Sequence, residues 1–289
     1  MRRDITEKLP FPIHLDIEVS SFCQLNCRMC PYRKMTRAHG FMEISLAEKI
    51  FIEAAGQVQD VYLHHMGEPL LHTQFEEFVK LAKQANCAVS ASTNAILLTP
   101  ARTESLIKAG LDNLVISLDA FTKETYLLLR EDYFEQVMGN VLHALQIAKD
   151  YGKKDFLDIQ LIQMKDNEQE VSQFKQYYDD LFSDSGAGKV IIKPMVTWAG
   201  NIPKEWRVSL EYSDFVCTML NYSMTIEWDG DVVVCCHDYD KFTKMGNVKD
   251  SSIQEIWDGV GYDKLRTAHK SKDFPALGYC RGCYENEHD

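Results

Sequence analysis

The run Cys23-Gln24-Leu25-Asn26-Cys27-Arg28-Met29-Cys30 follows a short apolar segment and decides how the rest of the chain is interpreted. Three thiols so close together cannot all pair as disulfides, because one is left over. A single zinc ion would lack its fourth protein ligand, and zinc sites usually take paired C-x2-C units. A cubane iron–sulfur cluster held by three cysteines keeps one iron open for a further ligand. The run therefore predicts a metal centre with a vacant coordination position.

The composition limits the class of protein. The chain has 289 residues, 45% of them hydrophobic, enough to bury one large core or a large and a small one. No apolar run approaches the ~20 residues of a membrane span, and no apolar region follows the charged start, as a secretory signal would require. Nine cysteines clustered near the two ends fit metal ligation in a reducing cytosol. We expect a cytoplasmic protein that does not enter a membrane.

The net charge of the chain indicates which partners it can bind. Lys and Arg number 31 against 43 Asp and Glu, a formal net charge of −12. Such a surface repels phosphate backbones. We therefore expect no nucleic-acid partner.

Short β-rich runs alternate with helical periodicity over the first two thirds of the chain. Strands are predicted at residues 14–19, 60–65, 88–93, 113–118, 156–163 and 189–194. Helices are predicted between them at residues 45–57, 73–86, 99–109, 133–151 and 168–183. This repetition predicts a parallel sheet with right-handed crossovers, and six units are too few for a closed eight-stranded barrel. The predicted fold class is α/β, a partial (β/α)6 barrel with its chemistry at the carboxyl ends of the strands.

The sequence changes character from about Met195. An irregular stretch leads to a predicted hairpin of residues 223–228 and 232–236, turned at Asp229-Gly230. A helix is predicted at residues 253–269. We predict two domains: residues 1–205, the partial barrel, and residues 206–289, a small domain of a hairpin and a helix.

The spacing C-x3-C-x2-C of Cys23, Cys27 and Cys30 resembles that of the radical S-adenosylmethionine (SAM) superfamily. The resemblance implies that these cysteines hold a 4Fe-4S cluster whose open iron binds SAM. Reduction would then give a 5′-deoxyadenosyl radical that abstracts hydrogen from a substrate. It also implies an external reductant of the flavodoxin or ferredoxin type.

Residues after the second strand resemble a SAM-binding motif of that family. Gly67-Glu68-Pro69 keeps the turn and the carboxylate, while Met66 stands where the family usually has another glycine. The resemblance implies that Gly67 and Glu68 orient the amino group of SAM. As a tripeptide alone, Gly-Glu-Pro could be an ordinary turn.

The ends of the next two strands carry further candidates. The resemblance implies that Asn94 and Ser117 contact the ribose or methionine part of SAM and that Arg130 holds its carboxylate. A guanidinium suits that task because its fork binds a carboxylate through two hydrogen bonds. As alternatives, Asn94 and Ser117 are ordinary caps and Arg130 is a solvated helix charge.

A second set of cysteines lies near the chain end. It comprises Cys217, Cys235, Cys280 and Cys283, with Gly230 between the first two. The layout resembles the twitch domain, a shortened SPASM domain that holds one auxiliary 4Fe-4S cluster. The resemblance thus implies two clusters, the second fully ligated and suited to electron transfer. A structural zinc ribbon remains the alternative for this set.

Three interpretations of Cys236 stay open. It could be a small buried hydrophobe, an alternate ligand, or a thiol that donates a hydrogen atom to a substrate radical. On a strand it would face away from Cys235. His64 and His65, at the end of the second strand, could face substrate, whereas His237 and Asp238 are more usual as exposed turn residues.

These features predict an enzyme acting on a small polar molecule. The first hypothesis is a two-electron oxidation of a sugar or aminocyclitol alcohol to a ketone, as in twitch-domain dehydrogenases that this chain resembles. The second is a redox-neutral epimerase with Cys236 as hydrogen donor, and the third is a peptide maturase. Cys23 lies too near the start for the leader-binding domain that many peptide maturases carry. A non-enzymatic electron carrier is disfavoured because it would not need an open iron and a SAM site.

Overall fold

The computed structural model describes residues 5–208 and 217–286. Its centre is a set of six parallel strands: β1 (His14–Ile17), β2 (Asp60–Tyr62), β3 (Ala88–Thr93), β4 (Asn113–Ser117), β5 (Leu157–Gln163) and β6 (Gly188–Pro194). Each strand pairs with the next in chain order. All six predicted strands are confirmed, with ends that differ by three residues at most.

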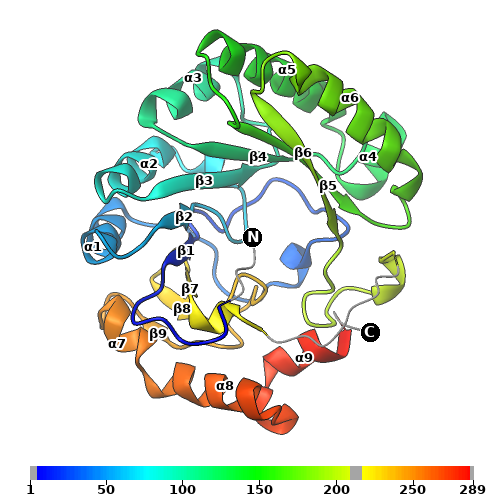
Figure 1. Cartoon of the computed structure of the whole chain (residues 1–289). Helices are drawn as coiled ribbons and strands as arrows, with labels where there is room; N and C mark the ends of the chain where they lie inside the picture. Colours follow the sequence, from blue (N-terminus) through cyan, green and yellow to red (C-terminus); the bar gives the residue numbers. More distant parts are fainter. Residues whose placement is uncertain (1–4, 209–216, 287–289) are drawn as a thin grey trace.

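Helices on the outer face of the sheet connect these strands (Figure 1). They are α1 (Ile44–Ala54), α2 (Phe75–Gln84), α3 (Pro100–Ala109), α4 (Lys123–Leu129), α5 (Phe134–Asp150) and α6 (Val171–Ser183). Their apolar faces and the strands form the main core, with Val61, Phe78, Leu106 and Leu114 almost without exposure. Five of these helices were predicted and α4 was missed.

The start and end of α3 follow from local chemistry. The Thr99 hydroxyl accepts a hydrogen bond from the backbone N–H of Arg102, and Pro100 occupies the first helical position. Gly110, with φ of +97°, ends the helix in the left-handed region that glycine enters most readily. The predicted cap and stop are both confirmed.

The sheet is curved but does not close. Its order is β6-β5-β4-β3-β2-β1-β7-β8-β9, so that β6 and β9 are the two edges of the sheet formed by the described residues. Helices cover the outside, while the segment after β1 runs across the inside of the curve (Figure 1). The predicted partial barrel is confirmed.

The C-terminal region continues this sheet. Strand β7 (Ser223–Ile226) pairs parallel with β1, and β8 (Asp231–Val233) and β9 (Gly246–Asn247) follow antiparallel. Gly230, with φ of +89°, forms the predicted hairpin turn. The two predicted domains therefore share one sheet, and a boundary at residue 205 stays a prediction.

Two local predictions in this region are wrong. The predicted helix 253–269 is two helices, α7 (Ile253–Trp257) and α8 (Val260–Ser271), because Gly259 stands before α8 with an extended backbone. The second hairpin strand ends at Val233, so Cys235 lies in a bend and Cys236 in the turn that follows it. A further helix, α9 (Tyr279–Asn286), carries Cys280 and Cys283.

None of the helices in the described part of the chain is both long and apolar enough to cross a bilayer.

Candidate active site

A cavity of about 210 Å³ lies at the carboxyl ends of the strands. The three cysteines of the N-terminal run, Cys23, Cys27 and Cys30, line it. The five residues predicted to bind SAM line it as well: Gly67, Glu68, Asn94, Ser117 and Arg130. The fold thus brings together side chains from the ends of β1 to β4, as expected for a parallel sheet. The space exceeds what one metal ion needs, so an organic ligand has room beside it.

Backbone hydrogen bonds hold the cysteine loop in place. The N–H of Arg28 donates to the carbonyl of Leu129 at 2.8 Å, and the N–H of Cys30 donates to the carbonyl of Cys27 at 3.1 Å. Burial raises the pKa of the Cys23 and Cys30 thiols to about 12. Without a metal these thiols are protonated at neutral pH, and metal binding would displace their protons.

The turn after β2 requires glycine. Gly67 has a φ of +79°, and a Cβ there would lie 2.3 Å from the carbonyl oxygen of Ser20. The substitution would therefore force the backbone of the cysteine loop away. This close contact places the next residue, Glu68, at the cavity wall.

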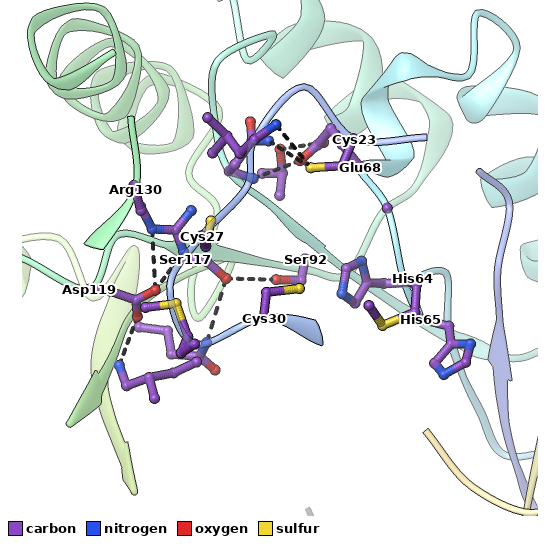
Figure 2. Close-up of a pocket in the computed structure, with 18 of the residues that line it drawn as sticks. Cys23, Cys27, Cys30, His64, His65, Glu68, Ser92, Ser117, Asp119 and Arg130 are labelled. Carbon is purple, nitrogen blue, oxygen red and sulfur yellow. Dashed lines mark hydrogen bonds and ion pairs between the residues drawn. The ribbon is translucent and has the colours of Figure 1, made fainter. Parts of the chain in front are cut away.

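The Glu68 carboxylate is buried and held by three donors. It accepts hydrogen bonds from the N–H of Leu70 (3.1 Å), the hydroxyl of Thr93 (2.7 Å) and the N–H of Asn94 (2.8 Å). Burial raises its pKa, and the three donors oppose that rise. The side chain lies next to Cys23 (Figure 2). A cationic amino group beside it would stabilise its charged form.

Asn94 and Ser117 differ in their local roles. The Asn94 side-chain oxygen accepts from the N–H of Ile96 at 3.0 Å, as a turn cap does, while its amide nitrogen lies 4.0 Å from the Cys23 sulfur. Ser117 bonds Ser92 on the neighbouring strand at 3.1 Å (Figure 2) and is no cap. Asn94 thus caps a turn and Ser117 does not, and the contact of either residue with SAM stays a prediction.

Arg130 is not a solvated charge. It is 9% exposed, and its guanidinium donates to the Asp119 carboxylate at 2.6 and 3.2 Å (Figure 2). Asp119 is fixed in turn by the N–H of Ile162 at 2.7 Å. Burial raises the pKa of Cys27, and the positive charge of Arg130 opposes the rise. The guanidinium therefore lies close to the cysteine loop, and its contact with a SAM carboxylate stays a prediction.

The two histidines at the end of β2 point in different directions. In Figure 2 the His64 ring points toward the middle of the cavity and the His65 ring points the other way. His65 lies 3.7 Å from the Glu18 carboxylate. Burial lowers the pKa of His64 to about 4, so its imidazole is neutral at pH 7. Its Nδ1 is buried and has no hydrogen-bond partner within the described ranges.

The second cysteine set also comes together. Cys217, Cys235, Cys280 and Cys283 line one small cavity, joined by His237 and His269. Burial raises the pKa of Cys235, and the neighbouring cysteines raise it further. The four thiols suit a cubane, in which each iron takes one cysteine. Among residues 5–208 and 217–286, no three His, Cys, Asp or Glu side chains are grouped closely enough to hold a single metal ion, and the zinc alternative for this set stays open.

The residues after Cys235 correct two expectations. Cys235 lines the second cavity and Cys236 does not, and neither residue lies on a strand. The Cys236 thiol is near enough to Tyr62 to add to the rise that burial causes in the tyrosine pKa. Asp238 is fully buried and accepts from the N–H and the hydroxyl of Thr243, both at 2.6 Å. The expectation that Asp238 is exposed is wrong.

A buried ion network beside the cavity was missed. The Arg37 guanidinium binds Glu18 through two hydrogen bonds of 2.9 and 2.6 Å and lies 3.2 Å from Glu227. It joins the segment after the cysteines to the ends of β1 and β7. No motif marks these residues, because their burial depends on the pairing of β1 with β7.

Comparison with known proteins agrees with this geometry. The model of the radical SAM superfamily matches residues 17–177, and that of an iron-sulfur cluster-binding domain, SPASM, matches residues 217–284. The matches contain the first and the second cysteine set, respectively.

Relatives and a solved structure match nearly the whole chain. A tungsten-containing aldehyde ferredoxin oxidoreductase cofactor-modifying protein of Pyrococcus furiosus is 23% identical over 92% of this chain and 86% of its own length. An S-adenosyl-L-methionine-dependent 2-deoxy-scyllo-inosamine dehydrogenase of Niallia circulans is 21% identical over 93% of this chain and 91% of its own. The crystal structure of BtrN with AdoMet and 2-DOIA aligns with a TM-score of 0.63 at 19% identity, covering 95% of this chain and 93% of that one. On its sequence match and its fold, the chain belongs to the radical SAM superfamily, in the subclass with a SPASM or twitch region.

Proposed function

We propose that this radical SAM enzyme oxidises an alcohol carbon of a sugar or aminocyclitol to a ketone. The observation that carries the proposal is a polar part of the cavity wall beyond the cysteines, formed by Tyr62, His64, Ser92 and Gln160. These hydroxyl, amide and imidazole groups can donate to and accept from several hydroxyls of one substrate. A polyol or aminocyclitol offers such groups on every face.

Residues nearer the loop are assigned to the cofactors. Cys23, Cys27 and Cys30 would hold a 4Fe-4S cluster, and the buried Glu68 carboxylate would accept a hydrogen bond from the amino group of SAM. Cluster and SAM, when bound and reduced by a flavodoxin- or ferredoxin-type protein, supply the radical that abstracts hydrogen from the substrate. The turn at Gly67 keeps the carboxylate at the required place.

We assign His64 as the proton acceptor. Loss of a hydrogen atom from a carbinol carbon makes its hydroxyl much more acidic, so a weak base suffices. Burial keeps the imidazole neutral, and its Nδ1 has no other partner among the described residues. The ring points into the cavity (Figure 2). His64 can therefore take the hydroxyl proton as the carbonyl forms.

The second cysteine set completes the proposal. Cys217, Cys235, Cys280 and Cys283 would hold a second 4Fe-4S cluster with no open iron, suited to accept the remaining electron. We keep residues 206–289 as the region that provides this site and residues 1–205 as the barrel. The relative named as a 2-deoxy-scyllo-inosamine dehydrogenase supports the substrate class.

Product analysis tests the proposal. Anaerobically reconstituted protein is incubated with SAM, titanium(III) citrate and 2-deoxy-scyllo-inosamine or related aminocyclitols and sugars. We expect a product lighter by two hydrogens, with one 5′-deoxyadenosine formed for each ketone. SAM cleavage without any such product from the panel would contradict the proposed substrate class.

The epimerase remains the second candidate because the Cys236 thiol lies near Tyr62 on the cavity wall. Epimerisation leaves the substrate mass unchanged and incorporates one deuterium from D2O. Cys236→Ala should abolish that incorporation, whereas it should leave alcohol oxidation within about threefold of the original rate. The two results separate the candidates.

A further inference from the structure

An aromatic pair separates the two cysteine cavities. The Trp198 ring lines the first cavity, and the His237 ring lines the second. Their ring centroids are 5.7 Å apart, with the planes at 55°. The two cavities are therefore linked by one direct contact between a lining residue of each, and we call this Trp198–His237 pair the wall.

Hydrogen bonds fix this wall to both cysteine sets. The Trp198 indole N–H donates to the carbonyl of Met29, between Cys27 and Cys30, at 3.1 Å. The Tyr279 hydroxyl, one residue before Cys280, is shared between the carbonyl oxygens of His237 (2.8 Å) and Trp198 (3.2 Å). The pair is therefore tied to the N-terminal loop on one side and to α9 on the other.

The turn at residues 198–200, which contains Trp198, has an unusual backbone. Trp198, Ala199 and Gly200 have φ values of +53°, +54° and +85°. Residues with a Cβ rarely adopt this region, and such conformations persist where surrounding contacts enforce them. Gly282, between Cys280 and Cys283, packs so closely that a Cβ there would lie 2.3 Å from the Ala199 carbonyl oxygen. The structure holds the turn in a strained form directly against the second cysteine set.

We propose that Trp198 and His237 form the contact through which an electron passes between the two cysteine sites. Electron transfer slows steeply as the gap between packed groups widens, and the two ring centroids are only 5.7 Å apart. The contact exists whatever the substrate is, and only the direction of transfer rests on the proposed function.

For alcohol oxidation, the hydrogen atom, the proton and the electron that the substrate loses are all accounted for. The carbinol hydrogen atom goes to the 5′-deoxyadenosyl radical and the hydroxyl proton goes to His64. The last electron would cross Trp198 and His237 to the oxidised 4Fe-4S cluster that the four cysteines of the second site would hold, and that cluster would be reduced by one electron. The carbon–oxygen double bond forms as the electron leaves.

A substrate-free measurement tests the contact. Holoprotein is photoreduced by one electron with a deazaflavin, freeze-quenched at increasing times, and examined by electron paramagnetic resonance. Added SAM shifts the signal of the first site alone, so that the two sites are distinguished. Trp198→Leu removes the ring and should slow equilibration between the sites at least about tenfold, whereas Trp198→Phe keeps a ring and should stay within about threefold.

Trp228→Leu is the matched control. Its indole also donates to a backbone carbonyl, that of Ala38 at 3.2 Å, but the ring lines neither cysteine cavity. Equilibration should be unchanged in this variant. Unchanged equilibration in Trp198→Leu, with iron still present at both sites, would overturn the proposal.

Two further results keep the test decisive. If Trp198→Leu loses iron from the second site, His237→Leu removes the other ring while the Trp198 bond to Met29 remains, and the same slowing is expected. If the wild-type enzyme forms no ketone while Trp198→Leu still slows equilibration, the proposed function fails and the electron contact stands.

Discussion

The two cysteine sites are built in opposite ways. Three cysteines of the first site come from one run of eight residues, Cys23 to Cys30, and open onto a cavity of about 210 Å³. The four cysteines of the second site come from the segment before β7, from the bend after β8 and from α9. They line a cavity of only about 20 Å³. The first leaves space for an organic ligand and the second leaves none. This difference in the number and spacing of the thiols supports the proposal that the first site carries out chemistry and the second transfers electrons.

Removing one cysteine from each site should have the largest effect on activity, and it tests the difference between the two sites directly. Cys27→Ala should abolish SAM cleavage and leave about four irons per chain of about eight. Cys280→Ala should also leave about four irons but keep SAM cleavage, while ketone formation is lost. Iron and sulfide analysis with 5′-deoxyadenosine assays measures both. SAM cleavage in Cys27→Ala at the original rate would refute the assignment of the first site.

The next largest effect is expected at His64. His64→Asn should lower ketone formation by about 10²- to 10⁴-fold, the usual contribution of a general base, with SAM affinity unchanged. His72→Asn is the control, because His72 is buried but both ring nitrogens bond backbone groups outside the cavity, those of Met42 and Gln74. Steady-state rates of ketone formation from the alcohol substrate test the two variants. Equal losses in the two variants would assign His64 a structural role only.

A smaller effect is expected at Glu68. Glu68→Gln should weaken SAM binding by about 10- to 100-fold, because a hydrogen bond to a charged group contributes about 1.5–3 kcal/mol. Glu170→Gln is matched, since Glu170 accepts bonds from the N–H of Phe121 and the hydroxyl of Thr125 but does not line the cavity. It should lower thermal stability and leave SAM affinity unchanged. Equilibrium dialysis with labelled SAM measures both, and weaker binding in Glu170→Gln alone would contradict the assignment.

The last prediction concerns stability rather than either site. Burial opposes the charged form of His14, but Asp16 and Asp60 more than offset it and raise the pKa of His14 to about 9. The folded state therefore gains stability that is fully present below about pH 6.5 and is lost as the pH rises through about 9, at most about 3 kcal/mol. Urea unfolding at pH 6 and pH 9.5 measures it. His14→Gln should flatten this dependence, and a variant that keeps the full pH dependence would exclude His14 as its source.

The sequence predicts local features well. The six parallel strands, the cap at Thr99 and the turn at Asp229-Gly230 each follow from a few neighbouring residues, and the structure contains them all. The first cysteine run belongs to this class, because its ligands lie within one loop. Helix α4 was missed because its seven residues are too few to show a clear periodicity.

Features that depend on distant pairing were not predicted. The placement of β7 beside β1 has no local signal, and the burial of Glu18 and of the Arg37 side chain follows from it. The solvated interpretation of Arg130 is wrong because its guanidinium is buried and donates hydrogen bonds to Asp119, eleven residues earlier. Trp198 was predicted only as part of an irregular stretch, since its contacts come from Met29 and Tyr279.

The pairing of β7 with β1 also limits how this protein can be cut. Strand β1 leads directly into the first cysteine loop and has hydrogen-bonded neighbours on both sides, β2 and β7. Excising everything after the barrel would strip one side of β1 and leave its amide and carbonyl groups available to other molecules. A minimal catalytic fragment for engineering must therefore retain β7. Without β7 we expect the fragment to self-associate before any cofactor is loaded.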